Sequence, residues 1–286
     1  MRVGILPYEL RYEYDLAKVA VNSLLWPGQD VPNVETLAGL NADDHVVVYP
    51  SSKRLLRGFG NVRCKVDLML AEPFAIHKRY YQCMWLFRRK FNAIYCRYGY
   101  YAHRYENVVQ FAVVDSWVDG NLVYNTFPKT KTCSLIASGK QDLQGHKLRH
   151  QIVAWVRENG FKVDVLGRGF APFELKQEGL LPYHYSVVIE NVQETDYFTE
   201  KLLDCLLCST LPIYWGAPNI RDYFDLNGMI ICHSARDIQK AINQSKIVPS
   251  LSQKISMEKN RITALALSHL HSRIVAAVKQ QENQCL

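Results

Sequence analysis

The 286-residue sequence lacks any apolar run that approaches the roughly 20 residues needed by a membrane-spanning helix. Its first residues, MRVGILPYEL, contain only a short apolar stretch and no small-residue cleavage site, which argues against a signal peptide or a signal anchor. Internal repeats and low-complexity tracts are also missing. We therefore expect a globular protein of the cytoplasm with no transmembrane segment.

The sequence also lacks the cysteine spacing of a metal site. Its eight cysteines are scattered singly, apart from Cys205 and Cys208. A structural zinc ion needs two such pairs, or a pair with nearby histidines. Cys205 and Cys208 fall on the apolar face of a predicted helix, so we interpret them as core thiols. Scattered cysteines without a disulfide pattern are typical of proteins in a reducing compartment.

The charge balance is basic, with a net charge of +7 and a pI of about 8.9. A positive field favours anionic partners, including nucleotide diphosphates, anionic lipids, lipopolysaccharide cores and nucleic acids. The charge alone does not choose among them. Hydrophobic residues make up 48% and charged residues 21% of the chain, which is ordinary for a globular protein.

The first 120 or so residues alternate predicted strands with predicted helices, which indicates a parallel α/β domain. The strands are expected at 3–6, 45–49, 66–70, 93–96 and 108–114, and the helices at 15–25 and 80–90. A polar stretch at 119–129 looks like a hinge. We expect an N-terminal α/β domain over residues 1–125.

A second α/β alternation follows the hinge. The predicted strands are 133–137, 163–166, 186–189, 211–215 and 229–232, and the predicted helices are 146–158, 198–209 and 252–280. The chain is long enough for two domains of common size. We expect a second α/β domain over 126–250 and terminal helices over 251–286.

Residues 183–220 form the most informative stretch, YHYSVVIENVQETDYFTEKLLDCLLCSTLPIYWGAPNI. Its pattern predicts a strand, a loop, a helix capped by Thr195 or Asp196, and a second strand. Such a unit puts a helix start at the carboxyl edge of a parallel sheet, where ligands bind and phosphates are favoured. Glu200 and Lys201 fall in the first turn, so one can reach a sugar hydroxyl and the other a phosphate.

This stretch resembles glycosyltransferase family 10, the α1,3/4-fucosyltransferases and their relatives. The similar pieces are YHYSVVIEN at 183–191, YFTEKL at 197–202 and LPIYWGAPN at 211–219. The resemblance implies the GT-B fold, in which two Rossmann-like α/β domains face each other across a cleft. It is strongest over residues 129–230, so the second domain is expected to bind the donor and the first the acceptor.

The resemblance implies phosphate contacts by arginine. Arg149 follows the segment KTKTCSLIAS within GHKLR, where family members use an arginine on the nucleotide phosphates. Arg168 is a second phosphate candidate from the residues alone, because the turn Gly167–Gly169 can bring the backbone close to a ligand, although a single Gly-x-Gly is a weak signal. A guanidinium can clamp a pyrophosphate by paired hydrogen bonds. The alternative for Arg149 is an ordinary solvated helix face.

The resemblance assigns further donor contacts around the predicted helix start. Glu200 would hold the donor ribose and Lys201 the diphosphate, with Tyr197 packing nearby and Thr199 at the helix start that meets the leaving charge. Glu190–Asn191 would line the donor pocket. For Glu200 and Lys201 the alternative is a charged first turn. For Glu190 it is a loop carboxylate that accepts local N–H groups.

Glu72 is the expected general base. Inverting transfer needs a carboxylate that takes the proton from the acceptor hydroxyl. Glu72 lies in LAEPFAI, which resembles a pattern of family 10-like sequences, at the end of a predicted strand of the first domain. The alternative is a cap or a salt-bridge residue near Arg79 or Lys78.

Residues 78–105 interleave arginines with tyrosines, which suits stacking on sugars or bases. If this segment is functional it forms the acceptor side, with Arg79, Tyr80 and Arg97 as acceptor-binding candidates. The alternative is a solvated basic helix followed by a tyrosine-rich core.

The resemblance thus implies an inverting glycosyltransferase, with GDP-fucose favoured as co-substrate and a glycan acceptor such as lipopolysaccharide, capsule or a lipid-linked glycan. No Asp-x-Asp pair occurs, so we expect no metal and no other cofactor, with Arg149 and Lys201 replacing the ion. No membrane stem is visible. A bacterial or viral cytoplasmic enzyme is therefore expected, with a position at the membrane surface left open.

Two other function classes stay open. One is a phage-type enzyme that transfers a different sugar to hydroxymethylated bases of duplex DNA, which the net charge permits. The other is a non-catalytic module that binds nucleotide sugars, against which Glu72, Arg149 and Lys201 together argue.

Overall fold

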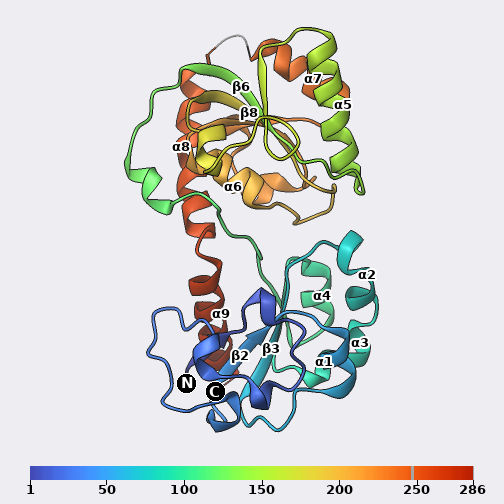
Figure 1. The fold of residues 1–286 in the computed structure, drawn as a ribbon, viewed down its shortest axis with the longest axis vertical. Helices are drawn as coiled ribbons and strands as arrows, with labels where there is room; N and C mark the ends of the chain where they lie inside the picture. Colours follow the sequence, from blue (N-terminus) through green and yellow to red (C-terminus); the bar gives the residue numbers. More distant parts are fainter. Residues whose placement is uncertain (246–247, 286) are drawn as a thin grey trace. The chain divides into compact units, whose positions relative to one another are not determined.

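The computed structural model describes residues 1–245 and 248–285. The chain divides into two compact units, Met1–Val113 with Leu270–Leu286 and Val114–His269 (Figure 1). The observed division comes earlier than the expected one at 125/126. The terminal helices do not form a separate segment: α8 (Leu251–Leu267) packs in the second unit and α9 (Leu270–Cys285) in the first. None of the helices in the described part is both long and apolar enough to span a bilayer.

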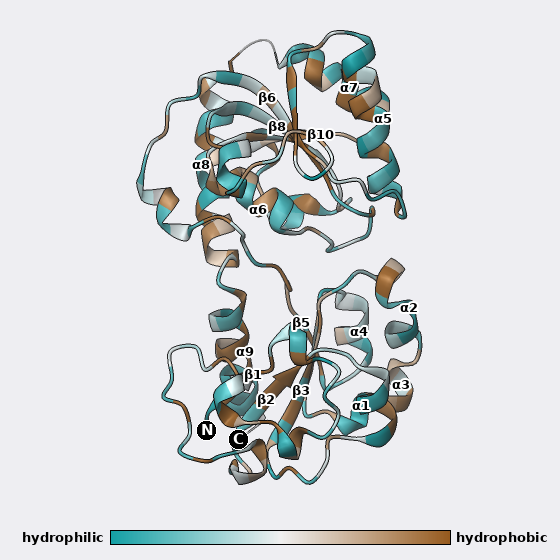
Figure 2. Cartoon of the chain, in the orientation of Figure 1, coloured by the Kyte–Doolittle hydropathy of each residue, from teal (hydrophilic) through white to brown (hydrophobic). Residues whose placement is uncertain are grey.

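The first unit is built on a five-stranded parallel sheet in sequential order. Its strands are β1 (Val3–Ile5), β2 (His45–Val48), β3 (Lys65–Leu70), β4 (Ile94–Cys96) and β5 (Val108–Gln110). Its remaining helices are α1 (Ser52–Arg57), α2 (Phe74–Gln82), α3 (Met84–Phe87) and α4 (Gly99–Arg104). The strands are largely hydrophobic (Figure 2), and their apolar residues are divided between the two faces of the sheet.

Each face of this sheet has its own core. Val46 and Val48 point into a core with Met84 and Phe87 of α3. Val47, between them, points into the opposite core, which α9 covers. The period-2 alternation of β2 therefore packs both faces, as expected for a buried parallel strand.

The helix predicted at 15–25 is wrong. This segment contains only the 3₁₀ turns Leu16–Lys18 and Val21–Ser23. Its backbone bonds to distant segments instead: Val21 N donates to Glu35 O at 3.0 Å, and Leu25 exchanges two bonds of 2.9 Å with Ile5. The predicted helix 80–90 is also broken, into the end of α2, α3 and a 3₁₀ turn at Arg88–Lys90.

The second unit holds another parallel sheet, in the order β10-β9-β8-β6-β7. Its strands are β6 (Lys131–Ile136), β7 (Val163–Leu166), β8 (Tyr183–Ile189), β9 (Leu211–Trp215) and β10 (Ile230–Ile231). Its helices are α5 (Gln144–Glu158), α6 (Glu200–Leu207), α7 (Ala235–Gln244) and α8. The order reverses between β8 and β6, so α5 and α6 both start at the carboxyl edge beside this switch point.

Short 3₁₀ turns fill the remaining connections. Besides those named above, they lie at Tyr8–Leu10, Leu37–Gly39, Gly120–Tyr124, Lys176–Gly179, Ile220–Asp222 and Leu226–Gly228.

Candidate functional site

The end of β8 and the start of α5 approach each other as closely as a backbone allows. Gly145 N donates to Asn191 O at 2.8 Å. A Cβ atom at Gly145 would lie only 1.7 Å from Glu190 O. Only glycine fits there, so this position of the GHKLR motif fixes where α5 starts relative to Glu190–Asn191.

Arg149 lies on α5 just beyond this contact and is directed at the end of β8. Its Nη2 donates to Asn191 Oδ1 at 2.6 Å. The side chain is only 6% exposed, so the alternative of a solvated helix face is wrong. Burial lowers the pKa of the guanidinium, and the Glu190 carboxylate acts in the opposite direction. Its buried Nε has no partner within the described residues, and a buried unpaired donor is suited to a ligand oxygen.

Glu190 closes β8 and anchors the start of α6. Its side chain is fully buried, with Oε1 accepting from Thr199 N at 2.8 Å and Oε2 from Thr199 Oγ1 at 2.7 Å. Glu190 therefore takes the local structural role that the sequence left as an alternative. A carboxylate at a helix N-terminus is favoured by the helix dipole. Because Glu190 already takes the Thr199 amide, an external anion would depend more on nearby side chains.

The helix cap is Thr199, and the prediction of Thr195 or Asp196 is wrong. The Thr199 hydroxyl accepts from Lys201 N at 3.4 Å. Asp196 adopts a positive φ of 61° and accepts hydrogen bonds from Asn219 and Tyr223, at 2.7 and 2.8 Å. It thus ties the loop before α6 to the segment after β9.

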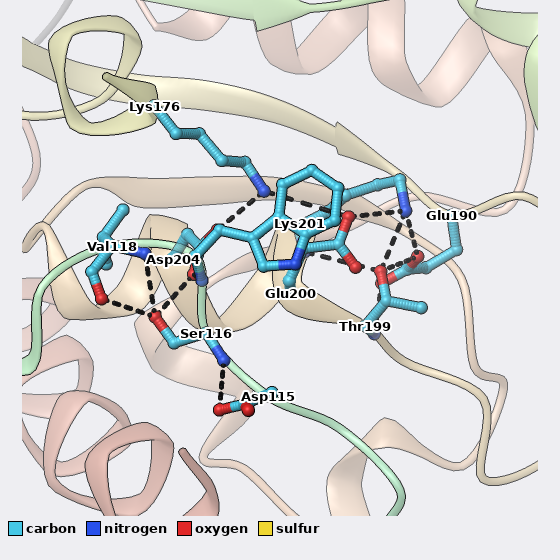
Figure 3. A network of polar contacts seen from close by, with 10 residues as sticks. Asp115, Ser116, Val118, Lys176, Glu190, Thr199, Glu200, Lys201 and Asp204 are labelled. Carbon is cyan, nitrogen blue, oxygen red and sulfur yellow. Dashed lines mark hydrogen bonds and ion pairs between the residues drawn. The ribbon is translucent and has the colours of Figure 1, made fainter. Parts of the chain in front are cut away.

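Glu200 and Lys201 form the first turn of α6, as predicted (Figure 3). Lys201 Nζ donates to Thr199 Oγ1 at 2.9 Å and to Glu200 Oε1 at 3.2 Å, and lies 3.5 Å from Glu190 Oε2. Burial opposes the charge of Lys201, but Glu190 and Glu200 outweigh it and raise its pKa. Burial likewise opposes the charge of Glu200, whose pKa is nevertheless lowered by Lys201 and Lys176. The cation at this helix start is therefore already offset by protein carboxylates.

A second ion pair, which the sequence analysis missed, continues this network along α6 (Figure 3). Lys176 Nζ lies 2.6 Å from Asp204 Oδ2 and 3.8 Å from Glu200 Oε1, and 4.7 Å from the centre of the Trp117 ring. Asp204 is fully buried and accepts from Ser116 Oγ at 2.8 Å and Trp117 N at 3.0 Å. Burial raises the pKa of Asp204, although Lys176 acts against it.

His146 is another neighbour that the sequence analysis missed. It is buried three residues before Arg149, on the same face of α5, and its Nδ1 accepts from Leu143 N at 3.3 Å. Burial and the charge of Arg149 lower its pKa, while the Asn191 side chain acts in the opposite direction. The i, i+3 spacing in GHKLR could have pointed to it.

The two remaining predicted donor residues differ in their position: Tyr197 lies beside this cluster and Arg168 does not. Tyr197 is 2% exposed and packs beside this cluster, where its charge interaction reaches Arg149. Arg168 is exposed, and within residues 1–245 and 248–285 no hydrogen bond or ion pair joins it to the cluster. Its turn is tight, because a Cβ at Gly167, with φ of 109°, would lie 2.2 Å from Ala137 O.

The predicted acceptor residues belong to the first unit. Glu72 lies between β3 and α2, is partly exposed, and accepts from Tyr81 Oη through its backbone carbonyl at 3.0 Å. No ion pair joins it to Lys78 or Arg79 in the described chain, which disfavours the salt-bridge alternative. Arg97 is 3% exposed and donates to Ala71 O at 2.5 Å and Val113 O at 2.9 Å.

The burial of Arg97 argues against its predicted contact with an acceptor. Its bond to Ala71 instead holds the chain immediately before Glu72. Arg79 is exposed and Tyr80 partly exposed, so both are accessible. The Tyr80 hydroxyl lies 3.3 Å from Ser52 Oγ.

The structure agrees with the core interpretation of the cysteine pair, since Cys205 and Cys208 are buried free thiols. Within residues 1–245 and 248–285, no three His, Cys, Asp or Glu side chains are grouped as a metal site would need. The metal-independent chemistry expected from the sequence stays a prediction.

Comparison with protein families finds a match that lies in the second unit. Residues 127–227 match the model of glycosyltransferase family 10 (fucosyltransferase), C-terminal part, which confirms the resemblance. The α-(1,3)-fucosyltransferase FucT of Helicobacter pylori is 34% identical over 71 residues, 25% of this chain and 15% of that protein. A putative fucosyltransferase-like protein of Arabidopsis thaliana is 28% identical over 111 residues, 38% of this chain and 21% of that protein. The matches span about a fifth or less of these relatives.

Solved structures show the fold. An α,α-trehalose 6-phosphate synthase from Burkholderia multivorans aligns with a TM-score of 0.57 and 9% identity, over 86% of this chain and 72% of that chain. A crystal structure of an α1,3-fucosyltransferase aligns with a TM-score of 0.49 and 16% identity, over 77% and 70% of the chains. The two parallel-sheet α/β domains are those of the GT-B fold, as predicted.

Proposed function

We propose that the protein is an inverting glycosyltransferase that transfers fucose from GDP-fucose to a hydroxyl of a glycan, such as lipopolysaccharide, capsule or a lipid-linked glycan. The observation that carries the proposal is the buried, unpaired Nε of Arg149. It lies in the segment that matches the family, beside a cluster that also contains Asn191 and Lys201.

The donor diphosphate would be held by Arg149 and Lys201. Glu190 and Glu200 balance the charges of Arg149 and Lys201, so the four side chains carry no net charge. The diphosphate would therefore be held by directed hydrogen bonds, above all from the unpaired Nε of Arg149, and these donors would meet the charge that grows as the sugar leaves. Glu200, whose pKa is lowered, remains an acceptor for the ribose hydroxyls at neutral pH.

Glu72 would act as the general base in a single displacement. Its carboxylate takes the proton of the acceptor hydroxyl, the hydroxyl oxygen bonds to the anomeric carbon, and the bond to the nucleoside diphosphate breaks with its electron pair. The bond from Arg97 to Ala71 would fix the direction of this carboxylate. Arg149 and Lys201 would take the place of a divalent ion.

A nucleotide screen tests the proposal. GDP, UDP, ADP and CMP are compared by thermal shift in buffer with a chelator. At 100 times its dissociation constant, a nucleotide that binds the native state adds about 2.7 kcal/mol of stability. We expect GDP to give the largest shift, and GDP-fucose with a glycan acceptor to give a fucosylated product of inverted configuration. No shift with any nucleotide would contradict the proposal.

A further inference from the structure

Three large apolar side chains are exposed on helices α1 and α3 of the first unit. Leu56 of α1 is 81% exposed, and Trp85 and Leu86 of α3 are 63% and 62% exposed. The other two residues of α3, Met84 and Phe87, are buried in the core. One side of α3 therefore holds the helix on the sheet, while the other presents tryptophan and leucine to solvent.

The helices that carry these side chains are fixed beside each other. Lys90, in the turn after α3, donates through Nζ to the carbonyl of Leu56 at 3.3 Å. Phe91 packs against Phe59 after α1 and against Phe87 of α3, with ring centres 5.1 and 6.2 Å apart. The exposed side chains thus belong to one surface, on the side of the first unit where Figure 1 shows α1 and α3.

The elements that carry this surface are basic, although Glu13 and Asp15 of the preceding segment lie beside α1. The segments 51–66 and 73–105, which include α1 to α4, contain no aspartate or glutamate. We define the basic apolar surface by its three apolar residues and the cations of the same elements: Leu56, Trp85, Leu86, Lys53, Arg57, Arg88, Arg89 and Lys90.

This surface lies away from the proposed base. Glu72 follows the carboxyl end of β3, whereas α3 and its following turn lead into the amino end of β4. In a parallel sheet these ends are opposite edges. An occupant of the basic apolar surface would therefore leave the Glu72 edge open.

We propose that the basic apolar surface docks the protein on an anionic lipid bilayer. Tryptophan favours the membrane–water interface, leucine the acyl region below it, and clustered Lys and Arg side chains are attracted by anionic headgroups. Leu56 and Leu86 favour lipid over single-stranded nucleic acid, which would be bound through stacking aromatics. The proposal concerns docking alone and holds whichever sugar is transferred.

Vesicle flotation of the full chain tests this proposal. We expect binding to vesicles of phosphatidylcholine with phosphatidylglycerol, weakened by salt, and little binding to phosphatidylcholine alone. Trp85→Ser with Leu86→Ser should weaken binding at least about tenfold. Lys53→Glu with Arg89→Glu should weaken it at least about 30-fold, since each charge near the surface contributes about 1 kcal/mol, a factor of about five.

A matched control uses exposed apolar residues of the other unit. Leu251 and Ile255 on α8 are 75% and 54% exposed, and their double change to serine should leave vesicle binding unchanged. The proposal would be overturned if the Leu251/Ile255 variant lost as much vesicle binding as the Trp85/Leu86 variant. It would also be overturned if the protein bound neutral vesicles as well as anionic ones, or if it bound a single-stranded oligonucleotide but no vesicles. Nucleotide-dependent thermal shifts should be the same in all these variants, which separates this test from that of the donor site.

Discussion

Glu190 and Thr199 are joined by two hydrogen bonds, from the Thr199 amide and hydroxyl to the two oxygens of one buried carboxylate, at 2.8 and 2.7 Å. This pair fixes the start of α6 to the end of β8. It also gives Lys201 an anionic neighbour. The geometry of the proposed donor site therefore depends on a carboxylate that belongs to the protein.

Changing Glu190 to Gln should destabilise the protein by about 2–4 kcal/mol, because Lys201 loses a buried anionic neighbour and Thr199 a charged acceptor. Urea denaturation measures the loss. Thr199→Ser, which keeps the hydroxyl and the amide, is the control and should cost less than about 1 kcal/mol. A fully stable Glu190→Gln variant would show that this contact is not needed for the fold.

Changing Lys176 to Met should cost about 3–5 kcal/mol, because Asp204 then remains buried as an unpaired carboxylate. Adding Asp204→Asn should recover part of that loss. The coupling energy comes from a double-mutant cycle in urea. Strict additivity of the two changes would contradict a working ion pair between Lys176 and Asp204.

Changing Glu72 to Gln should lower turnover by 10²- to 10⁴-fold, because a general base is removed. The affinity for GDP should stay unchanged, since Glu72 belongs to the other unit. Glu106→Gln, an exposed change in the same unit, is the control. Retained turnover in Glu72→Gln would exclude Glu72 as the base, and an equal loss of GDP affinity would indicate a disturbed fold.

Lys129 should give a pH-dependent contribution to stability. Burial lowers its pKa to about 8, although it donates to Cys208 O at 2.7 Å. The unfolded chain, with a lysine pKa near 10.4, binds more protons than the folded chain between pH 8 and 10.4, so the contribution of Lys129 to stability rises with pH there. Burial raises the pKa of the nearby Cys208 thiol to about 12, so in the folded chain that thiol stays protonated across this window. Its titration in the unfolded chain is common to the wild type and the variant, so it cancels from their difference.

The measurement compares unfolding of the wild type with Lys129→Met across this window. The free energy of unfolding of the wild type should rise relative to that of the variant as the pH rises, by about 1–3 kcal/mol. Lys131→Met is the control: Lys131 donates hydrogen bonds to Asp164 and Tyr183, which raise its pKa. Its contribution should therefore stay constant across this window and be lost only above it. A constant difference for Lys129→Met would contradict the lowered pKa.

The parallel strands were predicted well, because short runs of β-branched and aromatic residues favour a strand over a helix or a loop. The runs of β7 and β9 were predicted to the residue. β9 is buried along its whole length, as its continuous apolar run indicates, whereas β7 is an edge strand that is only partly buried. The segment 15–25 was not predicted correctly, although its apolar spacing suited a helix. Leu16, Val21 and Leu24 are all buried, but long-range bonds to residues 5 and 35 replace the helical ones, and no local pattern records them.

For the proposed donor site, the sequence indicated which residues lie together but not all of their contacts. The motif brought Arg149, Asn191 and Lys201 to one edge, where the structure places them together. The wrong cap at Asp196 follows from partners more than twenty residues away, at Asn219 and Tyr223. The burial of Arg97 was likewise hidden, because an arginine that bonds carbonyls of other segments looks like any surface arginine in sequence.

The most direct test of the account is calorimetric titration of GDP in a chelating buffer, on the wild type and on Arg149→Lys. Lysine keeps the charge but not the paired donors, so we predict metal-free binding to the wild type and a loss of about 10- to 100-fold in the variant. Arg157→Lys, at the exposed end of the same helix, should bind GDP like the wild type. Wild-type binding that requires a divalent ion, or equal affinity in Arg149→Lys, would contradict a diphosphate site built from cationic side chains.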